Sequence, residues 1–176
     1  VNAQKNIHHR WDAMLQSFVN EKGQVDYQGW LTDQDNLDAY IETLAKMPPH
    51  ESDSKQAKLA YWINAYNAFT IKLILDNMPV QSILDIHDGK AWDVEWIKLG
   101  NKIYSLNHIE NKIIRPVFKE PRIHFAVNCA ANSCPKILNR AWTEDNIQRY
   151  LTKQTKAFIA NTTQNTIGES ELVLSN

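Results

Sequence analysis

Hydrophobic residues recur at helical spacing along most of this chain, and in one stretch they face nearly every direction. That stretch, residues 52–77, is typical of a helix buried on most sides, because a helix at a protein surface keeps a polar stripe. Four other stretches are apolar on one side only and predict helices that pack with that side: residues 4–20, 33–47, 106–118 and 143–161. In the first of these, His8 and His9 are expected on the solvated side.

Alternating apolar and polar residues predict a few short strands. Residues 93–99 and 102–106 flank the turn pair Gly100-Asn101 and are predicted to form a hairpin. Over residues 122–129 the apolar side chains occupy every second position, while His124 and Asn128 face the other way, which predicts a further strand. Shorter extended pieces are expected at residues 25–31 and 170–175.

These elements predict an α+β fold with a mainly helical body around the buried helix at about residues 55–77. A small antiparallel sheet is expected from three segments: residues 93–106, 122–129 and 170–175. At a length of 176 residues, the chain is expected to form a single domain, residues 1–176, with an N-terminal helical arm of about residues 1–50 packed on it.

Charge and composition argue against two classes of function. The 19 Lys and Arg residues balance the 20 Asp and Glu residues, so the chain lacks the positive excess of a nucleic-acid-binding protein. No run approaches the roughly 18 consecutive apolar residues of a membrane span, so no transmembrane segment is predicted. No cofactor motif is found, and no metal is predicted. The expected ligand is an unidentified small molecule or peptide, and a protein partner stays open.

Both cysteines fall in one short polar stretch, which makes it the first candidate for chemistry. Pro135 suits the first position of a helical turn, which would place the Cys134 thiol near free backbone N–H groups that lower its pKa. His124 is the nearest histidine in sequence and the candidate base, and N–H groups around Ser133 are candidates to stabilise an oxyanion. Several residues are candidates to orient the imidazole: Glu110, Asn64, Asn67 and Asn128.

The first functional hypothesis is therefore a thiol-dependent hydrolase or transferase that acts on amide-like bonds, with Cys134, His124 and Glu110 as catalytic residues. A zinc site is a weaker alternative. It would use His124, Cys129 and Cys134 with a fourth ligand from His108 or Glu110. The predicted strand sends His124 and Cys129 to opposite faces, which counts against it.

The second hypothesis is a non-catalytic ligand- or protein-binding module. A Cys129–Cys134 disulfide would close a small loop there, and it would also remove the nucleophile that the first hypothesis needs. The binding residues would come from the polar face of the predicted strand, the long helix and two arginines: Asn64, Asn67, Asn128, Ser133, Arg115 and Arg122.

A family likeness lies in four motifs: Tyr61-Trp62-Ile63-Asn64-Ala65-Tyr66-Asn67-Ala68, Ser105-Leu106 with Ile109-Glu110, Pro121-Arg122-Ile123-His124-Phe125-Ala126-Val127-Asn128-Cys129, and Ser133-Cys134-Pro135. They resemble the DUF547 family, whose function is unknown, and they carry a fainter similarity to papain-like and transglutaminase-like thiol enzymes. Family members usually have an acidic pair before Glu110 and a histidine after it, where this chain has Asn107-His108 and Asn111. The resemblance implies export, so a periplasmic or extracellular location after removal of a signal is expected.

Overall fold

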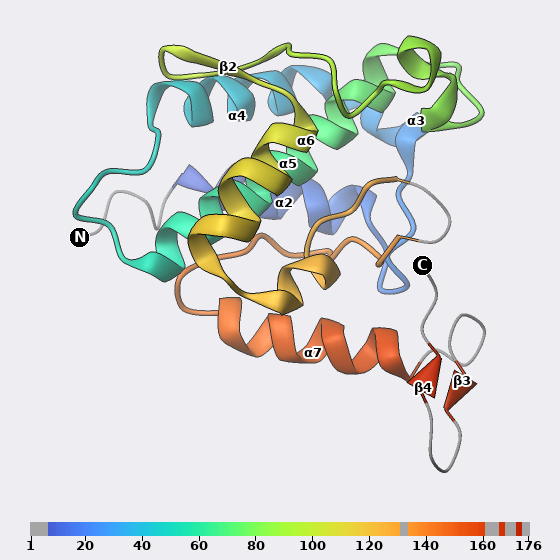
Figure 1. Cartoon of the computed structure of the whole chain (residues 1–176). Helices are drawn as coiled ribbons and strands as arrows, with labels where there is room; N and C mark the ends of the chain where they lie inside the picture. Colours follow the sequence, from blue (N-terminus) through green and yellow to red (C-terminus); the bar gives the residue numbers. More distant parts are fainter. Residues whose placement is uncertain (1–6, 131–133, 161–165, 168–171, 174–176) are drawn as a thin grey trace.

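Helix α5, Lys55–Asp76, runs through the middle of the molecule (Figure 1). The Ser54 hydroxyl begins it by accepting a hydrogen bond of 3.0 Å from the backbone N–H of Ala57. Most residues of α5 are buried, on all faces of the helix, and the core of the molecule surrounds it. The long buried helix predicted at about residues 55–77 is confirmed.

The computed structural model describes residues 7–130 and 134–160, together with the backbone of residues 166–167 and 172–173. The elements around α5 are α2 His9–Phe18, α3 Tyr27–Trp30, η1 Leu31–Asp33, α4 Gln34–Lys46, η2 Ile83–Gly89, β1 Ile97–Leu99, β2 Lys102–Tyr104, α6 Leu106–His108, η3 Ile109–Phe118, η4 Pro121–Phe125, α7 Ile147–Ile159, β3 Thr166–Ile167 and β4 Leu172–Val173. The fold is mainly helical with a small antiparallel sheet, as predicted. Within the described ranges, no helix is both long enough and apolar enough to cross a membrane.

The N-terminal helices share their core with α5 through aromatic side chains. The rings of Trp11 and Tyr40 stack with centroids 5.5 Å apart, and the ring of Trp30 lies 5.6 Å from that of Trp11. The Tyr61 hydroxyl of α5 donates a hydrogen bond of 2.7 Å to the carbonyl of Leu44 in α4. These contacts join α2, α3 and α4 to α5 in one apolar cluster.

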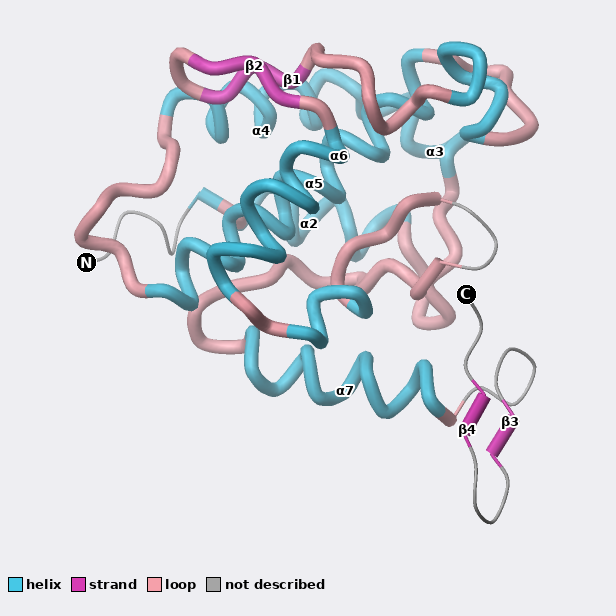
Figure 2. The backbone as a smooth tube through the Cα atoms, in the orientation of Figure 1, coloured by secondary structure: helices cyan, strands magenta, loops and turns pink. Residues whose placement is uncertain are grey.

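The predicted hairpin is confirmed, but the predicted three-segment sheet is wrong. Strands β1 and β2 pair antiparallel, and Gly100 in the turn between them takes a φ of 59°, which favours glycine. Strands β3 and β4 pair only with each other, at the far end of the molecule (Figure 2). The remaining positions of the strand predicted at 170–175 lie outside the described residues.

The strand predicted at residues 122–129 is wrong. Pro121 begins a 3-10 turn, η4, which the Glu120 side chain caps by accepting a hydrogen bond from the N–H of Arg122. The buried side chains that follow are Ile123, Ala126 and Val127, spaced three and four apart as in a helix. Beyond η4, the described chain runs to residue 130 without regular structure. The apolar alternation over residues 122–129 therefore does not form a strand, and the buried positions follow helical spacing instead.

Two predictions about the N-terminal region also need correction. Residues 27–31 are helical and not extended, because the Asp26 carboxylate caps α3 by accepting from the N–H of Gly29 at 2.9 Å. His8 is buried, with 4% of its surface exposed, whereas His9 is exposed as expected. The Nδ1 atom of His8 lies 2.7 Å from the hydroxyl of Tyr40. Burial lowers the pKa of His8 to about 4.

We expect His8 to make the stability of the protein depend on pH between about 6.5 and 4. The unfolded chain binds a proton at His8 as the pH falls through 6.5, while the folded chain resists until about 4. The free energy of unfolding should therefore be highest above 6.5 and should fall by up to about 3 kcal/mol across this window. Urea unfolding at pH 7 and pH 4.5 measures the difference. A His8→Gln variant should lose most of it, and a His9→Gln variant should keep it. Equal pH dependence in all three proteins would contradict the prediction.

Candidate functional site

Cys129 and Cys134 form a disulfide. Their Cα atoms lie 6.0 Å apart, within the usual span for such a bond. The disulfide of the second hypothesis is confirmed, and Cys134 has no free thiol in this state. The nucleophile predicted at Cys134 is thus absent from the oxidised protein, and a zinc site would lose both of its thiolate ligands. Ser133, the predicted oxyanion residue, lies outside the described residues.

The helical turn predicted at Pro135 is wrong. Residues 135–138 have no regular structure, so no helix dipole acts on Cys134. The Asn128 side chain sets this conformation from the other end of the disulfide loop. Its Nδ2 donates to the carbonyl of Pro135 at 2.7 Å, and its Oδ1 accepts from the N–H of Ala130 at 3.0 Å. Asn128 therefore joins the two ends of the loop through backbone groups, a structural role that leaves its predicted ligand contacts without support.

Asn64 and Asn67 of α5 hold two distant segments of backbone, and we call them the asparagine clamps. The Nδ2 of Asn67 donates to the carbonyl of Ala126 at 3.0 Å, and its Oδ1 accepts from the N–H of Asn128 at 2.9 Å. Asn64 makes the same pair of bonds to a single residue, Trp142, at 2.7 and 3.0 Å. Both clamps are buried and hydrogen-bonded to backbone, so they fix the segments around the disulfide, and ligand binding by either asparagine stays a prediction.

Removal of either clamp should destabilise the protein in the absence of any ligand. Asn64→Ala or Asn67→Ala leaves one backbone carbonyl and one backbone N–H buried without partners, at roughly 1–3 kcal/mol for each group. We expect each variant to lose about 2–5 kcal/mol of unfolding free energy in urea titrations.

Asn77→Ala is the matched control for the clamps, because Asn77 ends the same helix but is exposed and makes a single side-chain bond, to the carbonyl of Leu73. We expect a loss below about 1 kcal/mol for this control. Clamp variants as stable as the control would show that the clamps do not anchor the loops.

Glu110 lies in a cluster with Tyr66 and Arg115. The η3 segment is π-helical, so residues five apart share a face, and the Glu110 carboxylate accepts from the Arg115 guanidinium at 2.6 Å. The buried Tyr66 hydroxyl is hydrogen-bonded to the same carboxylate. Burial, followed by the charge and hydrogen bond of Glu110, raises the pKa of Tyr66. The Glu110 carboxylate is therefore hydrogen-bonded to Tyr66 and Arg115, and the Arg115 guanidinium is paired with that carboxylate.

His124 is exposed on η4 and contacts aromatic rings. Its ring centroid lies 5.3 Å from that of Phe125 and 6.2 Å from that of Phe158 on α7. Among the described residues, no hydrogen bond or ion pair joins any two of Cys134, His124 and Glu110. The structure thus gives each a different partner, and their catalytic roles stay predictions.

Arg122 joins η4 to α7. Its guanidinium forms two hydrogen bonds with the Glu120 carboxylate, at 2.7 and 2.8 Å, and reaches Gln148 and Thr152 on α7 at 2.8 and 2.9 Å. Hydrogen bonds from Arg122 lower the pKa of Glu120, against an opposing effect of partial burial. Because its donors are engaged in this way, Arg122 acts here as a link between elements, and anion binding by Arg122 stays a prediction.

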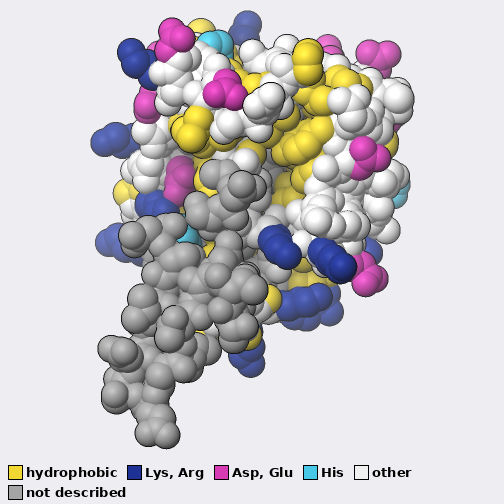
Figure 3. Space-filling model, turned by 90° about the vertical axis from the view of Figure 1, so that its right-hand side faces the viewer, with side chains coloured by type: hydrophobic (Ala, Val, Ile, Leu, Met, Phe, Trp, Pro, Cys, Tyr) yellow, Lys and Arg dark blue, Asp and Glu magenta, His cyan; other side chains and the backbone are white. Residues whose placement is uncertain are grey.

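A cavity of about 890 Å³ lies beside the disulfide, and we call it the disulfide cavity. Three segments line it: residues 21–23, residues 134–139 and the second half of α7. Among the described residues, its charged lining consists of Glu21 and three lysines, Lys22, Lys136 and Lys153, and we call these three lysines the lysine rim. Figure 3 shows Lys and Arg side chains gathered on the lower part of the face that carries the disulfide loop. Among the described residues, no acidic side chain forms an ion pair with the lysine rim.

Gly23 brings the first of these segments against the second. It takes a φ of 71°, and a Cβ atom placed on it would lie 2.5 Å from the Cβ of Lys136 and 2.9 Å from the carbonyl oxygen of Ile137. The Gln154 side chain of α7 donates to the carbonyl of Lys136 at 2.9 Å. The segment after the disulfide is thereby held from both sides, by the turn and by α7.

Gly23→Ala should destabilise the protein more than the same change at Gly89. Both glycines have a positive φ, of 71° and 81°, so each alanine costs roughly 1–2 kcal/mol through the backbone. At Gly89 the nearest atom to a new Cβ is the Leu84 carbonyl oxygen at 3.8 Å, so no contact must shift there. The difference in thermal stability between the two variants measures the free-energy cost of placing a Cβ atom against Lys136. Equal losses would mean that the turn and the 134–139 segment do not touch in solution.

The family described as "Protein of unknown function, DUF547" matches residues 50–159. The chain belongs to the DUF547 family. No curated protein and no solved structure matches it. The matched residues include both asparagine clamps, the disulfide and all of α7. Among the described residues that line the disulfide cavity, those of the turn, Glu21, Lys22 and Gly23, lie outside the DUF547 match.

Sequence reasoning missed the lysine rim. Lys22, Lys136 and Lys153 lie far apart in the chain, and each has an ordinary sequence context for a surface lysine. Only Lys136 carried a signal, since it follows the Cys134-Pro135 pair. Their convergence depends on the close approach at Gly23 and on the position of α7, neither of which follows from local sequence.

Proposed function

We propose that this DUF547 protein is a binding module that holds an anionic ligand with an apolar part in the disulfide cavity. The observation that carries the proposal is the charged lining of this cavity, which in the described part of the chain has three lysines and one glutamate. A volume of about 890 Å³ suits a small molecule or the end of a peptide, because such sites usually measure roughly 300–1,000 Å³.

The lining has parts for both halves of such a ligand. The ammonium groups of the lysine rim attract a carboxylate, sulfate or phosphate, and their attraction grows as water is displaced from the cavity. Ile137 and Phe158 are largely buried beside them and offer apolar contact. The alternative, a thiol hydrolase, needs a free Cys134, which the disulfide does not provide. Export, and with it an oxidising compartment, stays a prediction that agrees with the disulfide.

The dye 8-anilinonaphthalene-1-sulfonate tests the proposal, because it combines a sulfonate with aromatic rings. Its fluorescence should report saturable binding that weakens with added salt. Lys22→Gln and Lys153→Gln should each weaken binding by roughly two- to fivefold, as expected for the loss of one partly exposed charge. Lys102→Gln is the matched control, since Lys102 is an exposed lysine on β2 that does not line the cavity.

Ala157→Trp adds a steric test that leaves the charge unchanged. Ala157 lines the cavity from the exposed side of α7, so the indole should occupy space that the dye needs. Circular dichroism checks that every variant remains folded, because the dye also binds partly unfolded chains. Equal affinity for the wild type and the lysine rim variants, or an equal loss in Lys102→Gln, would refute the proposal.

A further inference from the structure

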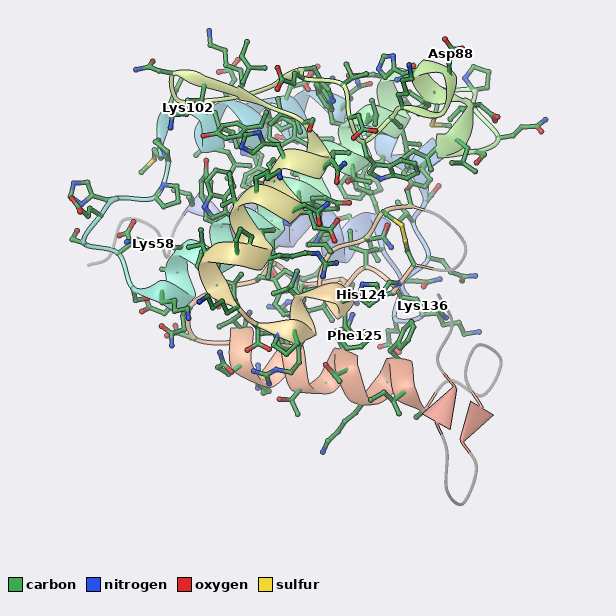
Figure 4. All side chains as sticks on the ribbon, viewed as in Figure 1. Lys58, Asp88, Lys102, His124, Phe125 and Lys136 are labelled. Carbon is green, nitrogen blue, oxygen red and sulfur yellow. A yellow bond between two sulfur atoms is a disulfide. The ribbon has the colours of Figure 1, made fainter. Side chains whose placement is uncertain are left out.

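The disulfide lies at the wall of the cavity and not in the core. Cys134 lines the disulfide cavity, and both cysteines are partly exposed, so a thiol reagent can reach the bond. Figure 4 shows the sulfur–sulfur bond in yellow and labels Lys136, which follows Cys134 by two residues on the same segment.

The charges around Cys134 would favour its ionised form. A thiolate is stabilised by nearby cations, and the lysine rim places three of them on the cavity that Cys134 lines. Glu21 is the one acidic residue among the described residues of this lining. Cys129 does not line this cavity. The two sulfurs therefore differ in that Cys134 shares the cavity with the lysine rim and Cys129 does not.

The loop has supports that survive loss of the sulfur–sulfur bond. Asn128 still bonds to the carbonyl of Pro135 and to the N–H of Ala130, and Asn67 still holds the residues on either side of Val127. Reduction would therefore leave Cys134 at the cavity wall, because the hydrogen bonds that position the segment involve neither sulfur.

We propose that Cys134 is a masked nucleophile, which thiol–disulfide exchange with a dithiol partner uncovers at the wall of the cavity. A thiolate of the partner attacks the sulfur of Cys129, the bond between the two cysteines breaks, and Cys134 leaves as the thiolate. Cys134 is the leaving group because the lysine rim stabilises its negative charge. The partner's second thiolate then displaces Cys129, which takes up one proton. The partner departs as a disulfide after giving up two electrons, and its other proton passes to solvent.

This proposal goes beyond ligand binding and does not depend on it. The dye experiments can fail while Cys134 still ionises readily, and the dye can bind while Cys134 behaves as an ordinary thiol. It also differs from the hypothesis drawn from the sequence in what activates the Cys134 thiol. The charges of the lysine rim replace the helix dipole at Pro135, which the structure does not contain.

A Cys129→Ser variant tests the proposal directly, because it leaves Cys134 permanently free. Its rate of alkylation by iodoacetamide, followed by mass spectrometry from pH 5 to pH 9, reports the thiolate fraction. We expect the midpoint to lie about one pH unit or more below the ordinary cysteine value of about 8.5. Adding Lys136→Gln or Lys153→Gln should raise the midpoint, and adding Lys102→Gln should leave it unchanged. A midpoint at or above the ordinary value, or an equal shift with Lys102→Gln, would overturn the proposal.

The wild-type protein provides a second measurement that does not depend on the folding of a variant. After reduction with dithiothreitol, a short pulse of iodoacetamide at pH 7 should label Cys134 at least about fivefold faster than Cys129, because the more ionised thiol reacts first. Equal labelling, or faster labelling of Cys129, would contradict the assignment of Cys134 as the activated sulfur.

Discussion

The structure depends on two buried asparagine side chains that project from one helix. Asn64 and Asn67 lie one turn apart on α5, and each forms two hydrogen bonds with backbone from the second half of the chain. Because α5 is the centre of the core, these bonds attach the segments that lead into and out of the disulfide loop to the core of the molecule. The segment of the cavity wall that follows the disulfide is thus positioned from the core, although residues 134–139 form neither helix nor strand.

Several predictions that rest on local chemistry match the structure. A helix that is apolar all round had to be buried, and a Gly-Asn pair between alternating runs had to turn, so α5 and the β1–β2 hairpin were both foreseeable. Ser105 caps the helix that starts at Leu106 for the same local reason. In the site, the sequence singled out the asparagines, the two cysteines and their loop, but it could not tell a ligand-binding amide from one that binds backbone. That choice depends on contacts between residues about 60 to 80 positions apart.

Several of the errors depend on contacts with distant residues. The stretch after Pro121 alternates like a strand, but it has no neighbouring strand, and Glu120 starts a 3-10 turn instead. His8 was predicted to be solvated, but the rings of Tyr40 and Tyr61 pack against it in the fold. The lysine rim depends on Gly23, whose lack of a side chain allows a turn near the N-terminus to approach a segment more than a hundred residues later. No short window of sequence contains both partners of the contacts that bury His8 or that bring Gly23 against Lys136.

The clamp at Asn67 gives the backbone after η4 the hydrogen-bond partners that a β-strand would have. A side-chain carboxamide has the same donor and acceptor as a peptide group. Asn67 donates to residue 126 and accepts from residue 128, which is the pattern that a neighbouring chain in a parallel sheet would offer around residue 127. In hydrogen bonding, residues 126–128 therefore behave as a strand whose partner is a single amide on a helix. Aspartate lacks the donor and glutamine is longer by one methylene, so asparagine alone combines this chemistry with this reach.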